Sequence, residues 1–436
     1  MTPMTGTALP VRLAASRRVQ AGLVLLPSCV LLAGLAAIAL SSLGRALSPV
    51  EQGLAFGVAL LPVVTPWLLR WRGVAWDPVL GGAVWMLCAL GVITVARVTP
   101  VLLEKQLLWI VLGWGALLGT LAVPDLTERL RRYKYTWLWG GLALALVTLV
   151  FGQDLSGSGI RLWLQLGPVT VQPSELLRVL LVVFLAAYLD ERRDLLSATS
   201  LPWGPLRLPP LPYLLPLLSM LGIILLILVF QHDLGPALLY FGTFLAMVYV
   251  TTGRRSYLLS GLGLFALAGA GGYALSGHIR NRFALWLDPW SDPQGQGYQS
   301  LQALEGLAFG GVAGRGPGYG YPTLIPAAHT DYPLAVIGEE WGLLGTLAVV
   351  VLYAVLTTRM LDLAAHLGRD RFGQLLGAGL GISLGLQAFI ILGGVLRLVP
   401  LTGITSPFLS YGGSSMIMSF VALGLLLRLW TEQTRA

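Results

Sequence analysis

The chain has 436 residues, of which 56% are hydrophobic and only 11% are charged, and its mean hydropathy is +0.77. Soluble globular domains are on average about 45–50% apolar and about 25% charged, so this composition excludes an ordinary soluble protein and indicates a polytopic membrane protein. The formal net charge is +8. In a membrane protein, topology and contact with anionic lipids explain a basic excess, and we expect no nucleic acid partner.

Twelve apolar windows are long enough to cross a membrane as helices, which takes about 17–25 residues each. The sequence shows no segments of alternating polarity, which a β-barrel would require. We therefore predict an all-α polytopic integral membrane fold with about 12 transmembrane helices. The windows lie at about 20–41, 51–69, 77–97, 106–122, 136–151, 173–190, 212–230, 234–251, 257–276, 335–357, 373–396 and 413–430.

The basic residues are distributed unevenly between the loops, and cytoplasmic loops carry the excess of Lys and Arg in membrane proteins. Of the 28 Lys and Arg residues, Arg178 falls inside a window. If the N-terminus is cytoplasmic, 19 of the others lie on the cytoplasmic side, and eight lie in the outer loops or at their borders. We therefore predict that both termini are cytoplasmic and that the first window is a retained span, not a signal peptide. The eight outer residues are Arg45, Arg97, Lys105, Arg161, Arg280, Arg282, Arg315 and Arg397.

The longest loop, residues 277–334, falls on the outer side and is rich in signals. Loops of this length are uncommon unless they are functional or disordered. The stretch LDPWSDPQGQGYQSLQALEGLAFGG carries Asp288, Asp292 and Glu305. Leucines at helical spacing predict a short amphipathic helix over 299–309 that lies at the membrane surface or dips into it. The glycine-rich stretch that follows would let the backbone pass close to another segment.

Ionisable residues inside apolar windows are costly, so each of them is a functional hypothesis. Glu175 and Arg178 share one helical face, where they form either a structural ion pair or the charged wall of a polar cavity. Asp233 directly precedes LGPALL, which suits a helix N-cap. The capping role and a functional role of Asp233 can coexist.

Two further polar stretches lie next to the last three windows. In IPAAHTDYPLAVIGEEWG, we expect one of the two adjacent glutamates to face a polar interior. In LTGITSPFLSYGGSSM, hydroxyls and glycines either pack helices or hold a sugar or a pyrophosphate at the mouth of a cavity. The candidate residues of the two stretches are His329, Asp331, Glu339, Glu340, Ser410 and Ser414.

On residue chemistry alone, two classes of function stay open. The outer acids fit general acid–base catalysis on a lipid-borne substrate, and they equally fit ion or proton coupling in a transporter. The sequence contains no HExxH, paired CxxC, EF-hand or Walker pattern, so metal sites and nucleotide hydrolysis have little support. Cys29 and Cys88 fall inside apolar windows, which predicts buried thiols.

Five motifs occur in a fixed order along the chain: QPSE, QHDLG, DPQGQGYQ, AHTDY followed by IGEE, and PLTGITSPFLSYGGSS. In these motifs the chain resembles the SEDS family (shape, elongation, division and sporulation), which includes the RodA and FtsW types. The resemblance covers roughly residues 77–430 and implies a ten-helix core with the large outer loop at 277–334. Residues 1–76 would add a cytoplasmic tail and two helices, and residues 431–436 a second cytoplasmic tail.

The resemblance implies a peptidoglycan glycosyltransferase that polymerises lipid II at the outer face of the cytoplasmic membrane, for elongation or division. It implies Asp292 as the catalytic residue, a general base for the 4-hydroxyl of the acceptor, with inversion and with undecaprenyl diphosphate as leaving group. A divalent cation, Mg²⁺ or Mn²⁺, is a candidate cofactor without assigned ligands. The implied partners are undecaprenyl-linked glycan, a class B penicillin-binding protein, other elongasome or divisome proteins and membrane lipids.

A lipid II flippase is the alternative, but it would need polar groups across the whole bilayer, whereas the clearest cluster here lies at the outer face. The chain departs from the family pattern at His232, where proline is usual, and at Ala327, where glutamate is usual. The residues expected to bind substrate are Arg161, Glu175, Arg178, Asp233, Arg282, Gln299, Arg315, His329, Asp331, Glu339, Ser410 and Ser414.

Overall fold

A computed structural model describes residues 17–40, 46–154, 161–167, 169–198, 201–203, 206–208, 211–368 and 370–435. Most of the predicted N-terminal tail lies outside these residues. Helices cover the predicted windows, and they are joined by three short 3₁₀ helices and two small hairpins. The helices are α1 (Arg17–Leu40), α2 (Pro49–Trp71), α3 (Pro78–Val98), α4 (Leu103–Ala122), α5 (Leu126–Arg132), α6 (Lys134–Phe151), α7 (Pro173–Ala198), α8 (Leu211–Phe230), α9 (Leu234–Thr252), α10 (Arg255–Leu275), α11 (Gly277–Leu287), α12 (Tyr298–Gly310), α13 (Pro333–Ala365), α14 (Arg371–Val395) and α15 (Gly413–Arg435).

The all-α polytopic fold is confirmed. Among the described residues, ten helices are long and apolar enough to cross a membrane. The two remaining windows are helical as well, as α7 and the 20-residue α8, and α7 carries Glu175 and Arg178 inside its apolar run. The last helix continues to Arg435, so residues predicted as a C-terminal tail extend α15.

The connecting elements are short. The 3₁₀ helices are η1 (Pro100–Leu102), η2 (Pro289–Ser291) and η3 (Pro322–Leu324). Strands β1 (Leu164–Leu166) and β2 (Val169–Val171) pair antiparallel, as do β3 (Leu201–Trp203) and β4 (Leu206–Leu208).

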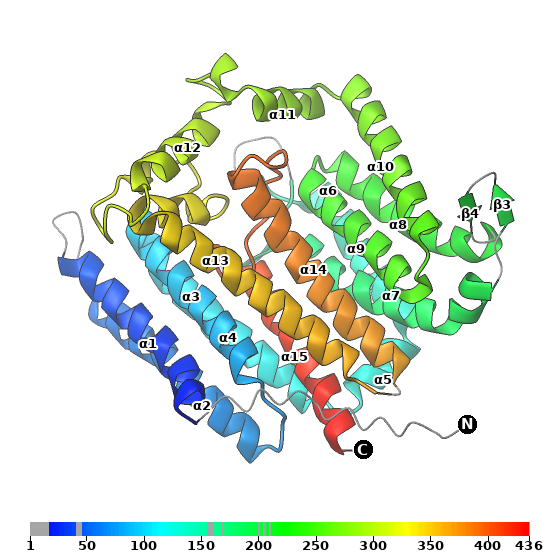
Figure 1. Cartoon of the computed structure of the whole chain (residues 1–436), viewed down its shortest axis with the longest axis horizontal. Helices are drawn as coiled ribbons and strands as arrows, with labels where there is room; N and C mark the ends of the chain where they lie inside the picture. Colours follow the sequence, from blue (N-terminus) through cyan, green and yellow to red (C-terminus); the bar gives the residue numbers. More distant parts are fainter. Residues whose placement is uncertain are drawn as a thin grey trace, which may run out of the picture.

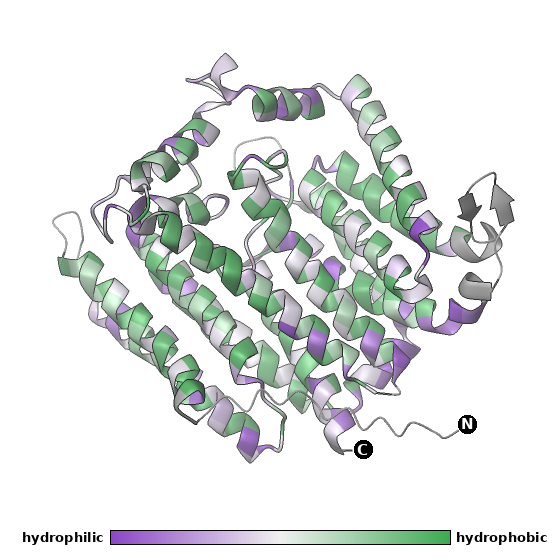
Figure 2. Ribbon diagram, viewed as in Figure 1, coloured by the Kyte–Doolittle hydropathy of each residue, from purple (hydrophilic) through white to green (hydrophobic). Residues whose placement is uncertain are grey.

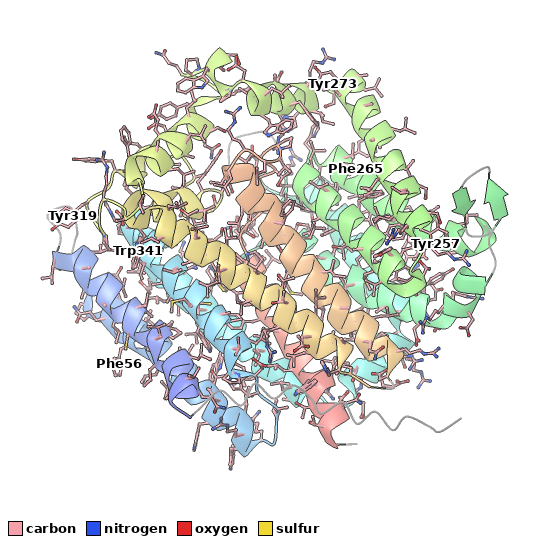
Figure 3. All side chains as sticks on the ribbon, viewed as in Figure 1. Phe56, Tyr257, Phe265, Tyr273, Tyr319 and Trp341 are labelled. Carbon is pink, nitrogen blue, oxygen red and sulfur yellow. The ribbon has the colours of Figure 1, made fainter. Side chains whose placement is uncertain are left out.

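The bundle is built around α3, α13, α14 and α15, which lie between two outer groups of helices (Figure 1). The α1–α2 pair packs against α3 at one edge, and α6 to α10 form the opposite side. Helix α10 stands at the periphery, where Phe265 stacks on Phe241 of α9 (Figure 3). At one end of the bundle, α11 and α12 run across the helix ends, and the C-terminus lies at the other end.

The segment between α14 and α15 enters the bundle instead of passing over it. Ile404, Phe408 and Leu409 are buried there. A methyl group on Gly91 of α3 would lie only 2.3 Å from the carbonyl oxygen of Leu409, so only glycine fits at this crossing. Irregular backbone of this kind is tolerated in a membrane protein where other protein segments surround it.

The predicted helix over 299–309 exists as α12, but its buried side packs on α13. That side consists mainly of small residues, including Ala303, Gly306 and Gly310, whereas Leu304 and Leu307 are only partly buried. Small residues at the contact let two helix backbones approach closely. The prediction therefore located the helix correctly and did not identify the side that packs.

The glycine-rich stretch after α12 inserts into a break in α13. Gly342 has φ 68°, and a side chain there would lie 2.3 Å from the backbone nitrogen of Gly314. The nitrogen of Arg315 donates to the carbonyl oxygen of Glu339 at 3.0 Å, which satisfies backbone groups at the break. The close backbone passage predicted for this stretch is therefore confirmed.

Candidate active site

A cavity of about 290 Å³ lies between α11, the start of α12 and the segment that follows α14. We call it the upper cavity, because it lies at the end of the bundle that α11 crosses in Figure 1. Its wall combines cationic, amide and carboxylate groups with apolar side chains. The lining residues are His278, Asn281, Arg282, Leu285, Trp286, Gln296, Gln299, Ser300, Asp331, Gly394, Arg397, Leu401 and Gly403.

Asp292 lies in the turn between η2 and α12, next to the lining residue Gln296. Its side chain is exposed and accepts hydrogen bonds from the backbone nitrogens of Gly295 at 3.0 Å and Gln296 at 2.8 Å. A methyl group on Gly295 would lie 2.3 Å from the carboxylate, and one on Gly297 would lie 2.2 Å from the carbonyl oxygen of Pro289. The glycines of DPQGQGY are thus the residues that allow this turn, and the turn fixes the carboxylate at the rim of the upper cavity.

Asp288 is the other exposed aspartate of this stretch, and its environment differs. Its carboxylate accepts a hydrogen bond from the nitrogen of Trp290 at 3.0 Å, where it caps η2. Neither aspartate is among the residues that line the upper cavity, but Asp292 is bonded to the lining residue Gln296, and Asp288 is not.

Arg282 is the central cation of the upper cavity. Its Nε donates to Nε2 of His278 at 3.1 Å, and its Nη1 donates to the carbonyl oxygen of Leu401 at 3.1 Å. These bonds hold the guanidinium between α11 and the segment after α14. Electrostatic attraction links Arg282 to both Asp233 and Asp331.

The two carboxyl groups near Arg282 are poised around neutral pH. Burial raises the pKa of Asp331 to about 6, although a hydrogen bond from Thr330 and the charge of Arg282 oppose the rise. Burial likewise raises the pKa of Asp233, in the connection between α8 and α9, to about 7, against the attraction of Arg282. Burial, with the adjacent charge of Arg282, lowers the pKa of His278. The cationic character of the upper cavity therefore rests on its arginines.

A buried polar cluster lies where α7 and α9 begin. Glu175 pairs with Arg178 at 3.4 Å, and it accepts a hydrogen bond from Oγ1 of Thr405 at 3.4 Å. Two Arg178 nitrogens, Nη1 and Nη2, and one oxygen each of Glu175 and Asp233 are buried without a hydrogen-bond partner in the described structure. The ion pair predicted for Glu175 and Arg178 is present, and the unfilled polar atoms show that the cluster keeps capacity for further hydrogen bonds.

His329, Ser410 and Ser414 position segments of the site. The Nδ1 of His329 lies 3.3 Å from Oγ1 of Thr99, and Oγ of Ser410 donates to the carbonyl oxygen of Thr330 at 2.6 Å. The latter bond ties the α14–α15 segment to the residue next to Asp331. Ser414 accepts a hydrogen bond from the backbone nitrogen of Gln172 at 2.9 Å, which joins α15 to the start of α7.

Of the twelve residues predicted to bind substrate, only Arg282, Gln299 and Asp331 line the upper cavity. Three of the others, Glu339, Arg315 and Arg161, lie away from both the cavity and the buried cluster. Glu339 accepts a hydrogen bond from the nitrogen of Tyr321 at 2.7 Å, and Arg315 stacks its guanidinium 4.8 Å from the ring centre of Phe309. Both therefore brace the glycine-rich stretch against α13, in the corner where Tyr319 and Trp341 are labelled in Figure 3. Arg161 is exposed, in the connection between α6 and β1.

The adjacent glutamate, Glu340, is buried and pairs with Arg97 at 2.6 Å. The guanidinium of Arg97 also donates to the carbonyl oxygen of Gly320 at 2.6 Å. Glu340 is therefore the glutamate that faces a polar interior, and Arg97 of α3 is its partner there.

Two residues of α11 that line the upper cavity, His278 and Trp286, were not predicted, although Arg282 between them was. His278 and Arg282 are four residues apart, and Trp286 lies four residues further, so the spacing would have placed all three on one face of a helix. Arg397 has φ 58° and uses Nη2 to donate to the carbonyl oxygens of Trp286 at 2.5 Å and Leu287 at 3.0 Å. In return, Nε1 of Trp286 donates to the carbonyl oxygen of Arg397 at 3.0 Å.

The described part of the chain contains no evident metal site. No group of three or more His, Cys, Asp or Glu side chains converges there. The carboxylate of Asp292 bonds to backbone nitrogens, and the buried Asp331 and Asp233 bear raised pKa values. The described residues therefore supply no convergent ligand set for a divalent cation, and none is assigned a role in the reaction.

Comparison with known proteins places this arrangement among cell-wall enzymes. Residues 75–435 match the family model of FtsW, RodA and SpoVE, described as cell cycle proteins. The chain is 37% identical over 364 residues to the peptidoglycan glycosyltransferase RodA of Mycobacterium tuberculosis, covering 81% of this chain and 77% of that protein. It is 33% identical over 332 residues to a probable peptidoglycan glycosyltransferase FtsW of Geobacter metallireducens, covering 76% and 85%.

Two solved structures share the fold. One chain of a peptidoglycan synthase complex that coordinates polymerization and crosslinking superposes with a TM-score of 0.69 at 30% identity, over 83% of this chain and 99% of that one. The rod shape determining protein RodA of Thermus thermophilus superposes with a TM-score of 0.59 at 28% identity, over 82% and 98%.

Proposed function

The chain belongs to the SEDS family of RodA- and FtsW-type peptidoglycan glycosyltransferases, and we propose that it polymerises lipid II with Asp292 as the general base. The observation that carries the proposal is the exposed Asp292 carboxylate, which two backbone N–H groups fix at the rim of a cavity that contains Arg282 and Arg397. A base needs access to the hydroxyl that it deprotonates, and a diphosphate leaving group needs cations nearby.

In the proposed reaction, Asp292 accepts the proton of the acceptor's 4-hydroxyl group. The oxygen attacks the anomeric carbon of the growing glycan, a new C–O bond forms, and the bond to the diphosphate breaks. The leaving diphosphate keeps the electron pair of that bond, and the attack from the opposite side inverts the anomeric centre. Arg282 and Arg397 stabilise the charge that develops on the diphosphate.

The other residues predicted to bind substrate have different roles under this proposal. Gln299, whose Nε2 donates to the carbonyl oxygen of Pro326 at 3.0 Å, and Asp331 face the substrate directly from the cavity wall. The buried cluster of Glu175, Arg178 and Asp233 forms a polar floor. His329, Ser410 and Ser414 hold the segments of the wall, and contacts of Arg161, Arg315 and Glu339 with the rest of the glycan stay predictions.

We further propose that the α11–α12 end faces the outside of the cytoplasmic membrane and that both termini are cytoplasmic. The excess of Lys and Arg in the loops at the opposite end supports this orientation. It would give Asp292 access to lipid II in the outer leaflet. Residues 77–430 would form the catalytic core, and α1 and α2 an addition at its edge.

The proposed partner is a class B penicillin-binding protein that crosslinks the strands. The similarity to a chain of a complex that coordinates polymerization and crosslinking supports this partner. Further elongasome or divisome proteins would join the same assembly.

The test is polymerisation of purified lipid II by the full chain with its transpeptidase. We expect Asp292→Asn to reduce glycan synthesis by at least about 100-fold, within the range for loss of a general base. Asp288→Asn is the matched control, because it changes an exposed capping aspartate four residues away, and it should retain activity.

Normal polymerisation by the Asp292→Asn protein would show that the carboxylate only stabilises its turn. Transport of lipid II across liposome membranes without polymerisation by the unmodified chain would instead support the flippase alternative.

A further inference from the structure

A second cavity lies at the opposite end of the bundle from the upper cavity. It has a volume of about 420 Å³ and is formed where α7 and α9 approach their last turns, α13 ends and α14 begins. We call it the basal cavity. Figure 2 shows hydrophilic residues gathered at this end of the bundle, where the C-terminus also lies.

Two exposed arginines line the basal cavity. Within the described part of the chain, Arg193 of α7 and Arg371 of α14 form no ion pair and no hydrogen bond. Carboxylates nearby already neutralise other basic residues. They are Asp190, 3.1 Å from Arg131; Glu191, paired with Lys134; and Asp362, 2.9 Å from Arg359.

Two more carboxylates neighbour the arginines in sequence but do not neutralise the cavity. Asp194 and Asp370 are exposed, line no part of it, and form no ion pair among the described residues. Gln374 and Thr251 complete the polar part of the wall. The polar part of the basal cavity therefore carries a net positive charge.

The rest of the wall is apolar. Leu361 of α13 and Leu375 of α14 are partly buried, and Val250 of α9 is 51% exposed. These side chains belong to helices that are apolar enough to cross a membrane. The basal cavity thus joins a cationic part at the helix ends to an apolar part on membrane-spanning helices.

We propose that the basal cavity binds an anionic phospholipid. The phosphate would be held by Arg193 and Arg371, since a guanidinium offers paired N–H donors to phosphate oxygens. One acyl chain would lie along Val250 and the neighbouring apolar residues. Basic pockets between membrane helices bind lipids with anionic headgroups. A zwitterionic headgroup would be disfavoured, because its amine would bring a positive charge beside two arginines. The inference does not depend on the proposed reaction.

Native mass spectrometry of the full chain, titrated with phosphatidylglycerol and separately with phosphatidylcholine, tests the proposal. We expect a retained phosphatidylglycerol whose affinity falls about tenfold or more in Arg193→Gln/Arg371→Gln, because each arginine near the membrane surface attracts anionic lipid. The matched control is Arg132→Gln/Arg255→Gln, which removes two exposed basic residues at the same end outside the cavity. This control should bind the lipid like the unmodified chain.

A second variant keeps the charges and blocks the space. Ala365 lines the basal cavity at the exposed end of α13, so Ala365→Phe should lower the affinity for phosphatidylglycerol even if the double variant folds poorly. Equal affinity for the two lipids, or equal losses in the control and the double variant, would overturn the proposal. Displacement of the lipid by excess inorganic phosphate would assign the site to a soluble anion instead.

Discussion

At the scale of single residues, the carboxyl groups of the candidate site differ in their exposure to water. Asp292 is open to water and accepts hydrogen bonds from two backbone N–H groups. Asp331 and Asp233 are shielded, and burial raises their pKa values to about 6 and about 7. Asp292 is therefore accessible to the hydroxyl that it would deprotonate, whereas Asp331 and Asp233 exchange a proton near neutral pH.

The raised pKa of Asp331 predicts a pH dependence of diphosphate binding. As the pH rises through about 6, Asp331 loses its proton, and its negative charge opposes the attraction of Arg282 for the diphosphate. The pKa of His278 is lowered, so this imidazole loses its charge at a lower pH than an ordinary histidine, and that loss weakens diphosphate binding in the same direction. We expect the affinity for a non-reactive polyprenyl diphosphate to fall about fivefold between pH 5 and pH 8, the effect of roughly 1 kcal/mol of charge repulsion.

Asp331→Asn serves as the comparison, because the amide is neutral throughout this range. The affinity of the Asp331→Asn protein for the diphosphate should change little between pH 5 and pH 8. A smaller change should remain from Asp233, whose pKa is about 7. Binding of the unmodified chain that strengthens as the pH rises would contradict the assignment of Asp331.

Residue patterns in the sequence pointed to Asp292 and to three residues that line the upper cavity, Arg282, Gln299 and Asp331. They did not point to His278, Asn281, Trp286, Gln296 or Ser300, which also line it. They could not show that Glu339 and Arg315 face the glycine-rich stretch while Arg282 faces the upper cavity. That division depends on the break in α13 at Gly342, a tertiary feature with no local periodicity.

At the scale of elements, hydropathy located the membrane helices well and the surface helices poorly. A spanning helix needs a long apolar run, which is visible in sequence without knowledge of its neighbours. Helix α11 has only 11 residues with mixed polarity, and α5 has 7, so neither produces such a run. Helix α11 is stabilised by its contacts, above all by Arg397 at its C-terminal end.

The clamp formed by Arg397 predicts a positioning role for this residue. Its guanidinium binds the carbonyl groups of Trp286 and Leu287 at the end of α11, six and five residues before Asp292, so its loss would free the turn that carries the base. We expect Arg397→Ala to lower turnover about tenfold, since small misplacements of reacting groups have effects of this order or larger. Arg397→Lys should restore little, because an ammonium group cannot reproduce the planar fork.

Arg280→Ala is the matched control on the same helix. Arg280 donates to the carbonyl oxygens of Tyr273 and Ala274 at the end of α10 and does not line the upper cavity. Hydrogen exchange should increase over residues 286–292 in Arg397→Ala and not in this control. Lower turnover with unchanged exchange would assign Arg397 to substrate contact alone.

At the scale of the whole molecule, the two cavities lie at opposite ends of the bundle and have different chemistry. The upper cavity combines arginines with buried carboxyl groups and adjoins an exposed base. The basal cavity has two unpaired arginines above an apolar wall. Because a membrane separates the two ends, the orientation of the chain decides which leaflet each cavity can reach.

The orientation can be measured with single cysteines in a chain whose Cys29 and Cys88 are replaced by alanine. Ser291→Cys places an exposed thiol in the α11–α12 end, and Glu128→Cys places one on α5, at the end where the C-terminus lies. We expect a membrane-impermeant maleimide to label the first in intact cells and the second only after permeabilisation, because the basic loops retain α5 in the cytoplasm. The opposite pattern would put Asp292 in the cytoplasm, out of reach of lipid II in the outer leaflet. It would thereby remove the basis for outer-face polymerisation even if the Asp292→Asn protein were inactive.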